Sequence, residues 1–143
     1  MIKNFTTPEF ADLLKQHGIE IDTPFYRYFD IVSPTVDRIG IDCQYGMLDI
    51  NSRYIAEGQE VCEPKPAYLL SEVLTWLPEK IGIGKLKYKL SIDLKKMMIW
   101  YSKNGYIGAM WLCEPMPIEQ LITQGLTEGW LTKEIIEQQI KDN

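Results

Sequence analysis

The chain of 143 residues is poor in the residue types that catalytic and metal sites most often use. It has one histidine, His17, and three cysteines, Cys43, Cys62 and Cys113, with no CxxC spacing. A serine or cysteine triad of the ordinary type needs a histidine as base, and a transition-metal site needs clustered ligands. We expect buried, reduced thiols and a histidine that caps a helix or lies at the surface. The sequence thus predicts neither a metal site nor a cofactor.

Long apolar runs and glycine-rich loops are also missing. No apolar run approaches the ~20 residues of a membrane span, and residues 1–5 lack the apolar core of a signal peptide. The segment Gly82-Ile83-Gly84 has no third glycine and does not open a helix after a strand, as a dinucleotide-binding loop would. We therefore expect a cytoplasmic protein with no membrane partner.

The residues that are present indicate one α+β domain over residues 1–143. Apolar residues at i, i+3, i+4 and i+7 predict a helix from Pro66, at its first position, to Leu77, where Pro78 ends it. From Lys85 the apolar period changes to two, which predicts a half-exposed antiparallel strand. Its apolar side holds Leu86, Tyr88, Leu90, Ile92 and Leu94.

Two further strands are predicted to complete a meander, over Met97–Ser102 and Tyr106–Leu112, with a type I′ turn at Asn104-Gly105 between them. We expect an antiparallel sheet packed by helices, in a single pair of layers. The other predicted elements are a helix from Thr7-Pro8 to Gly18, an aromatic strand Phe25–Val32, short strands Arg38–Cys43 and Gly46–Ile50, a helix from Ile118 to about Gly129, and a last helix capped by Thr132. Residues 51–65 are a possible mobile loop, and 132–143 a possible loosely packed helix.

Charge is unevenly distributed along the chain. The stretch Lys80–Lys103 holds seven lysines and one acidic residue, Asp93, so it carries +6 while the rest carries −11 and the whole −5. A lysine-lined sheet face with an aromatic side chain for stacking could bind nucleic acid. The residues of this candidate site are Lys85, Lys87, Lys89, Lys95, Lys96 and Trp100. A solvated face that discourages edge pairing is the alternative.

Scattered carboxylates are the only candidates for acid–base chemistry. Asp37, Asp42, Asp49 and Glu57 lie outside any EF-hand spacing, and no histidine is near them to complete a metal site. Distant carboxylates can still meet in a fold and act together. An enzyme of unknown type therefore stays open, although we assign no catalytic residue.

The order of segments resembles a group of short, uncharacterised phage and prophage proteins of gut Bacteroidetes. The residues that carry the resemblance are Leu13-Leu14-Lys15-Gln16-His17-Gly18-Ile19, Phe25-Tyr26-Arg27-Tyr28-Phe29, Pro66 to Leu77 with its Trp76-Leu77 end, Lys85 to Leu112, and Pro117 to Leu131. Pro78 departs from the pattern, since a basic residue and a continuing helix are expected there. The resemblance implies an α+β fold and a mobile-element setting, with no catalytic residues to transfer.

Three hypotheses for function follow from these observations. The first is a small, non-enzymatic protein that binds another macromolecule, with a protein partner placed first. The second is nucleic-acid binding by the lysine-lined sheet face, and the third is the carboxylate enzyme. An exposed apolar patch on the last helix would favour the first, a flat lysine-lined sheet the second, and a deep pocket holding the carboxylates the third. The oligomeric state does not follow from the sequence.

Overall fold

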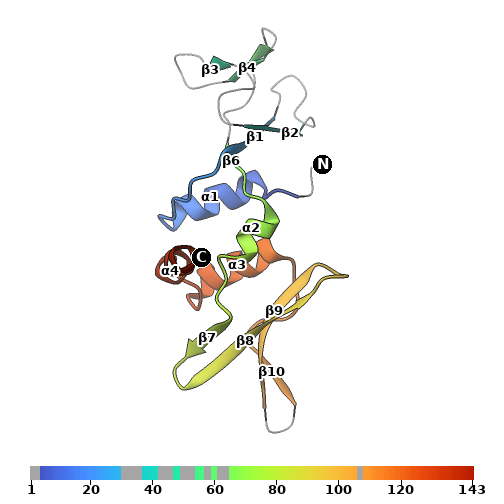
Figure 1. Ribbon diagram of the computed structural model, residues 1–143, viewed down its shortest axis with the longest axis vertical. Coiled ribbons are helices and arrows are strands. Elements are labelled where there is room, and N and C mark those ends of the chain that lie inside the picture. The colour runs from blue at the N-terminus through green and yellow to red at the C-terminus, as the bar shows by residue number, and fades with distance from the viewer. Residues whose placement is uncertain are drawn as a thin grey trace. The chain divides into compact units, whose positions relative to one another are not determined.

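A computed structural model describes residues 4–29, 37–41, 47–48, 54–56, 59–60, 65–105 and 108–143. The chain divides into two compact units, Met1–Leu70 and Ser71–Asn143, and each is described by itself. Helices and antiparallel sheets make up the described residues (Figure 1), which confirms the predicted α+β class.

The first unit begins with helix α1, Pro8–Gln16, whose ends are those that the sequence predicted. The N–H of Phe10 donates to Thr7 Oγ1 at 3.3 Å, and Pro8 occupies the first helical turn. His17 is the exposed C-cap, and Gly18 follows it with φ +69°, the left-handed conformation that glycine adopts freely. The helix buries Phe10, with Ala11 and Leu14.

A three-stranded sheet in this unit corrects the prediction for Pro66. Its order is β2-β1-β6, from Asp37–Ile41, Phe25–Phe29 and Lys65–Pro66. Pro66 pairs with Tyr26 instead of opening a helix, and Leu69 forms an isolated bridge with Phe5. The backbone of 65–69 is thus engaged in tertiary pairing, which overrides the local helical pattern. Helix α2 is consequently short, Leu70–Leu74.

A second small sheet has the order β3-β4-β5, from Met47–Leu48, Tyr54–Ala56 and Gln59–Glu60. The predicted strands over 38–43 and 46–50 are found in part, as β2 and β3. Most of the expected mobile loop, 51–65, lies outside the described residues, as do Cys43 and Cys62.

The second unit is built on a four-stranded antiparallel sheet of order β10-β9-β8-β7 (Figure 1). The strands are β7 Lys80–Ile83, β8 Leu86–Asp93, β9 Met98–Asn104 and β10 Ala109–Trp111. The meander was predicted, but β7 was not, because two glycines suggested a break where Gly82 lies within a strand. The Asn104-Gly105 prediction also needs correction, since Asn104 still pairs with Ala109 and the turn follows it.

Helices α3, Ile118–Glu128, and α4, Lys133–Asp142, complete this unit. Gly129, with φ +86°, ends α3, and the N–H of Ile135 donates to Thr132 Oγ1 at the start of α4, as predicted. Trp130 packs edge-on against Tyr101 of β9, with ring centroids 5.8 Å apart. Helix α4 buries Ile136 completely and ends with the Asn143 amide donating to the carbonyl of Thr75. Residues 132–143 are therefore packed within the unit.

Candidate nucleic-acid interface

The pairing register of the four-stranded sheet assigns its side chains to two faces. Residues directly opposite each other in an antiparallel pair point to the same side, and successive residues alternate. Ile81 pairs with Tyr88, and Leu90 pairs with Tyr101, so these four share one face. Lys80 pairs with Lys89, and Ser91 with Trp100, so these lie on the opposite face.

The first face is covered by the helices at its centre. Four of its side chains are buried, namely Ile81, Tyr88, Ile99 and Tyr101. The edge-on contact between Tyr101 and Trp130 joins this face to the C-terminal helices. The residues of this face that lie beyond the helices are exposed, namely Ile83, Leu86, Ile92 and Met110.

The opposite face is open. Among its described residues none is buried, and three lysines share it with two tryptophans. We call this set the lysine–tryptophan face: Lys80, Lys87, Lys89, Trp100 and Trp111. Lysine side chains together with aromatic rings are the components of sites that hold single-stranded nucleic acid.

The two tryptophans lie on neighbouring strands. Trp111 of β10 pairs with Ser102 of β9, and Trp100 precedes Ser102 by two residues, so the rings are diagonal neighbours on one face. Diagonal positions lie ~7–8 Å apart, within the reach of large aromatic side chains. Trp111 is 53% exposed, which leaves ring surface available to a ligand.

The lysines of this face have no carboxylate partner among the described residues. The ion pairs found there join Lys65 to Asp12 and Lys133 to Glu137, and neither includes a residue of the four-stranded sheet. Asp93, the one acidic residue of the strands, accepts backbone N–H groups from Lys95 and Lys96 through Oδ1. By the same register Asp93 shares the open face with the three lysines, and no lysine of the face forms an ion pair with a described carboxylate.

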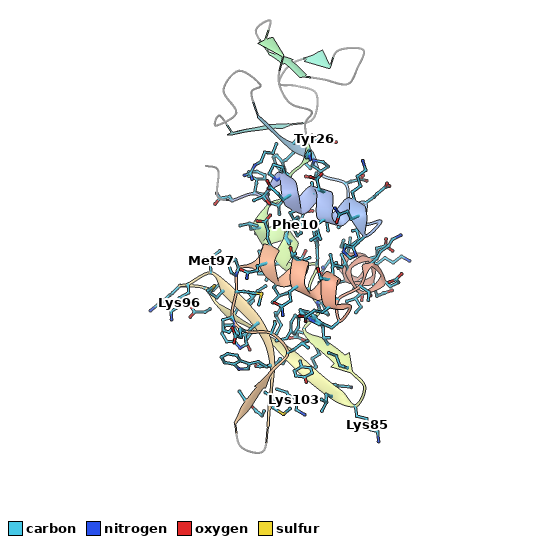
Figure 2. The ribbon with its side chains drawn as sticks, turned by 180° about the vertical axis from the view of Figure 1, so that it is seen from behind. Phe10, Tyr26, Lys85, Lys96, Met97 and Lys103 are labelled. Carbon is cyan, nitrogen blue, oxygen red and sulfur yellow. The ribbon has the colours of Figure 1, made fainter. Side chains whose placement is uncertain are left out.

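The structure places the predicted site residues in three locations. Lys87, Lys89 and Trp100 are brought together on the lysine–tryptophan face. Lys85 lies in the turn between β7 and β8, and Lys95 and Lys96 lie in the turn between β8 and β9 (Figure 2). Lys85 is therefore not part of the strand face on which it was predicted. Lys95 and Lys96 form a separate group in the other turn.

Two members of the face were not predicted. Lys80 was missed because β7 was not recognised as a strand, and Trp111 because the register of β10 does not follow from its own sequence. Tyr101, the next residue of β9, is a second aromatic side chain beside the predicted Trp100. The register separates them, since Tyr101 points to the helices and is completely buried.

A cavity of about 470 Å³ lies within the first unit. Its wall includes Tyr26 and Tyr68 and the charged residues Asp12, Lys15, Glu20, Asp22 and Lys65. Lys65 bridges both carboxylate oxygens of Asp12, at 2.7 and 2.8 Å. None of the four carboxylates considered for catalysis is among the described residues of the wall. Asp42, Asp49 and Glu57 lie outside the described residues, and Asp37 is described only as backbone of β2.

Cys113 is the buried thiol that the sequence predicted. Burial raises the pKa of its thiol, and the N–H of Tyr101, 3.4 Å from Sγ, opposes that rise. Burial also raises the pKa of the Tyr101 hydroxyl, which donates to the carbonyl of Pro78 at 2.7 Å. Both groups are held protonated, which suits packing and not nucleophilic chemistry. Among the described residues, no cluster of three or more His, Cys, Asp or Glu could hold a metal ion.

Comparisons with protein-family models, curated proteins and solved structures gave no match. Within the described part of the chain, every helix is too short or too polar to cross a membrane.

Proposed function

We propose that the chain acts by binding another macromolecule, and that this macromolecule is single-stranded nucleic acid held on the lysine–tryptophan face. The observation that carries the proposal is the strand register, which puts three lysines and two tryptophans on one open face. Lysines can contact successive phosphates while Trp100 and Trp111 stack on bases. Stacking on an aromatic ring tolerates any base, so we expect little sequence preference.

A single strand fits this surface better than a duplex. A broad four-stranded sheet does not enter the grooves where a helix or a two-stranded ribbon reads base edges. Unpaired bases, in contrast, can turn outward and stack on exposed rings. Trp111, at 53% exposure, offers such a ring.

The acidic net charge of the chain comes from residues 1–70 and not from the unit that carries this face. Residues 1–70 contain six basic and eleven acidic residues, whereas residues 71–143 contain nine of each. Within the second unit the lysines gather on the sheet strands and turns. We expect binding that is weaker than that of a strongly basic protein and sensitive to salt.

The setting of this function rests on the sequence alone. The resemblance to phage and prophage proteins supports a mobile-element origin. The sequence has few residues that could pair a nucleophile with a general base, which supports a non-enzymatic role. A carboxylate enzyme stays a prediction, because its candidate side chains lie outside those described.

The test is fluorescence anisotropy of labelled single- and double-stranded DNA and RNA across a salt series. We expect tighter binding to single strands. The slope of log K against log salt should be about −2, because three lysines each release about 0.7 counterion from a single strand. Stacking should also quench tryptophan emission on binding.

Two double variants of equal charge change provide the control. Lys87→Gln/Lys89→Gln should weaken binding about tenfold or more and reduce the salt slope by about 1.4, since two phosphate contacts are lost. Lys95→Gln/Lys96→Gln, on the same hairpin but off the face, should leave affinity within about threefold. Equal losses in both variants, or no binding at low salt, would show that this face is not the site.

A protein partner is the second candidate, and one observation favours it. Ile83, Leu86 and Met110 are exposed at one end of the helix-side face, beyond the helix cover. This patch is on the sheet, whereas the patch named as favouring a protein partner was one on the last helix. A variant Leu86→Ser/Met110→Ser that loses a partner while keeping nucleic-acid binding would support this alternative.

A further inference from the structure

The turn between β8 and β9 carries the most exposed large apolar side chains among the described residues. Leu94 is 74% exposed and Met97 is 65% exposed, and Ile92 beside them is 43% exposed. Lys95 and Lys96 lie between Leu94 and Met97. We call these five residues the hairpin tip. Figure 2 shows Lys96 and Met97 at the far end of the hairpin, with Lys85 and Lys103 toward the other end of the sheet.

Two hydrogen bonds from backbone N–H groups shape the turn of the hairpin tip. Asp93 Oδ1 accepts the backbone N–H groups of Lys95 and Lys96 at 3.1 and 3.2 Å, the arrangement of an Asx turn. Met97 has φ +52°, a left-handed conformation that costs ~1–2 kcal/mol for a residue other than glycine. Asparagine or glycine would suit this position better, and a polar residue would suit its exposure. An apolar side chain at a strained, exposed position therefore points to a contact with a partner.

We propose that the hairpin tip inserts into the surface of an anionic phospholipid bilayer. The side chains of the tip match the layers of a bilayer surface. Leu94 and Met97 can enter the boundary between headgroups and acyl chains, while Lys95 and Lys96 contact the lipid phosphates. The stems of the lysines can lie along the apolar layer with their ammonium groups in water. The lack of a membrane span in the sequence predicted no membrane partner, but a contact at the bilayer surface requires no span.

A bilayer fits the tip better than a folded protein partner does. A stable protein interface covers ~800 Å² on each partner with matched shapes, and a single protruding turn with three apolar side chains cannot supply that area. A bilayer needs no shape match, and apolar residues flanked by cations are sufficient for reversible attachment. The proposal is independent of nucleic-acid binding, since it uses none of the residues of the lysine–tryptophan face.

The experiment is flotation of the full chain with vesicles of phosphatidylcholine alone and of equimolar phosphatidylcholine and phosphatidylserine. We expect flotation only with phosphatidylserine present, and less at high salt. Lys95→Gln/Lys96→Gln should weaken it about thirtyfold, since each lysine near an anionic surface contributes ~1 kcal/mol. Leu94→Ser/Met97→Asn should also abolish flotation while preserving the turn, because asparagine tolerates a left-handed backbone.

The matched control is Lys87→Gln/Lys89→Gln, which removes the same charge from the same hairpin and should float like the wild type. Absence of flotation with phosphatidylserine would overturn the proposal, as would flotation that Leu94→Ser/Met97→Asn leaves unchanged. Sedimentation velocity of the free chain tests whether the hairpin tip instead binds a second copy of this chain. Self-association that Leu94→Ser/Met97→Asn abolishes would also overturn the bilayer proposal. Loss of nucleic-acid binding in the tip variants would reassign the tip to the nucleic-acid site.

Discussion

Lys80 of β7 and Lys89 of β8 are direct cross-strand partners, with both side chains on the open face of the sheet. Like charges at directly opposed positions reduce the stability of an antiparallel pair. No carboxylate among the described residues forms an ion pair with either lysine. A repulsive pair that folding alone would disfavour is consistent with a surface made for an anionic ligand.

Lys80→Glu should therefore change stability and binding in opposite directions. The new carboxylate would attract Lys89, and we expect the free energy of unfolding in urea to rise by ~0.2–1 kcal/mol. Affinity for single-stranded nucleic acid should fall at least fivefold, because one phosphate contact is lost and a negative charge is added. Lys85→Glu is the control, since it makes the same charge change in a turn with no opposed lysine. A loss of stability in Lys80→Glu would contradict the proposed repulsion.

Gly125 of α3 is required by a close approach from the following turn. A Cβ at this position would lie 2.7 Å from Leu131 Cβ and 3.0 Å from the Trp130 ring. Helix propensity alone predicts that Gly125→Ala stabilises the helix by ~1 kcal/mol, whereas overpacking costs ~1–3 kcal/mol. We expect the steric term to dominate and urea unfolding to show a net loss of stability. Thr127→Ala, exposed on the same helix, should change stability by less than ~0.5 kcal/mol.

Thr6 links the N-terminal segment to the chain that enters α2. It is completely buried, and its Oγ1 accepts the N–H of Tyr68 at 2.9 Å. Thr6→Val keeps the shape but leaves that N–H without its acceptor, so we expect a loss of ~1–3 kcal/mol in unfolding free energy. Thr6→Ser retains the oxygen and should lose less. Equal losses in the two variants would indicate that methyl packing, and not the hydrogen bond, is responsible.

The buried Tyr101 hydroxyl gives stability a dependence on alkaline pH. Burial, with the nearby Cys113 as a lesser cause, raises its pKa above the ordinary value of 10.0. The unfolded chain therefore ionises first, so stability is unaffected below that value and falls as the pH rises through it. Tyr101→Phe loses the hydrogen bond to Pro78 and should be less stable near neutrality. The gap from the wild type should narrow in urea unfolding above pH 10.0, and a constant gap would contradict the raised pKa.

Local signals in the sequence predicted the helix ends well. Thr7 and Thr132 act through a hydroxyl that accepts the N–H three residues ahead, and Gly18 and Gly129 act through their own left-handed backbone, so no distant partner is needed to recognise them. Pro66 shows the opposite case. Its place in β6 depends on pairing with Tyr26, which is forty residues away in the sequence.

The candidate site was predicted only in part, because local patterns reveal one strand and not its pairing with the others. The alternation in β8 placed Lys87 and Lys89 on one face without knowledge of the other strands. The addition of Lys80 and Trp111 depends on registers between strands that only the folded sheet supplies. Strand β7 was not predicted because it contains Gly82, and glycine usually weakens a strand interior.

The separation of the two sheet faces also bears on how this protein can evolve. Side chains on the open face are not buried, whereas Ile81, Tyr88, Ile99 and Tyr101 behind them hold the unit together. Substitutions at surface positions usually change stability by less than ~0.5 kcal/mol. The open face can therefore accumulate changes at little cost in stability, while selection on folding acts on the alternate residues of the same strands.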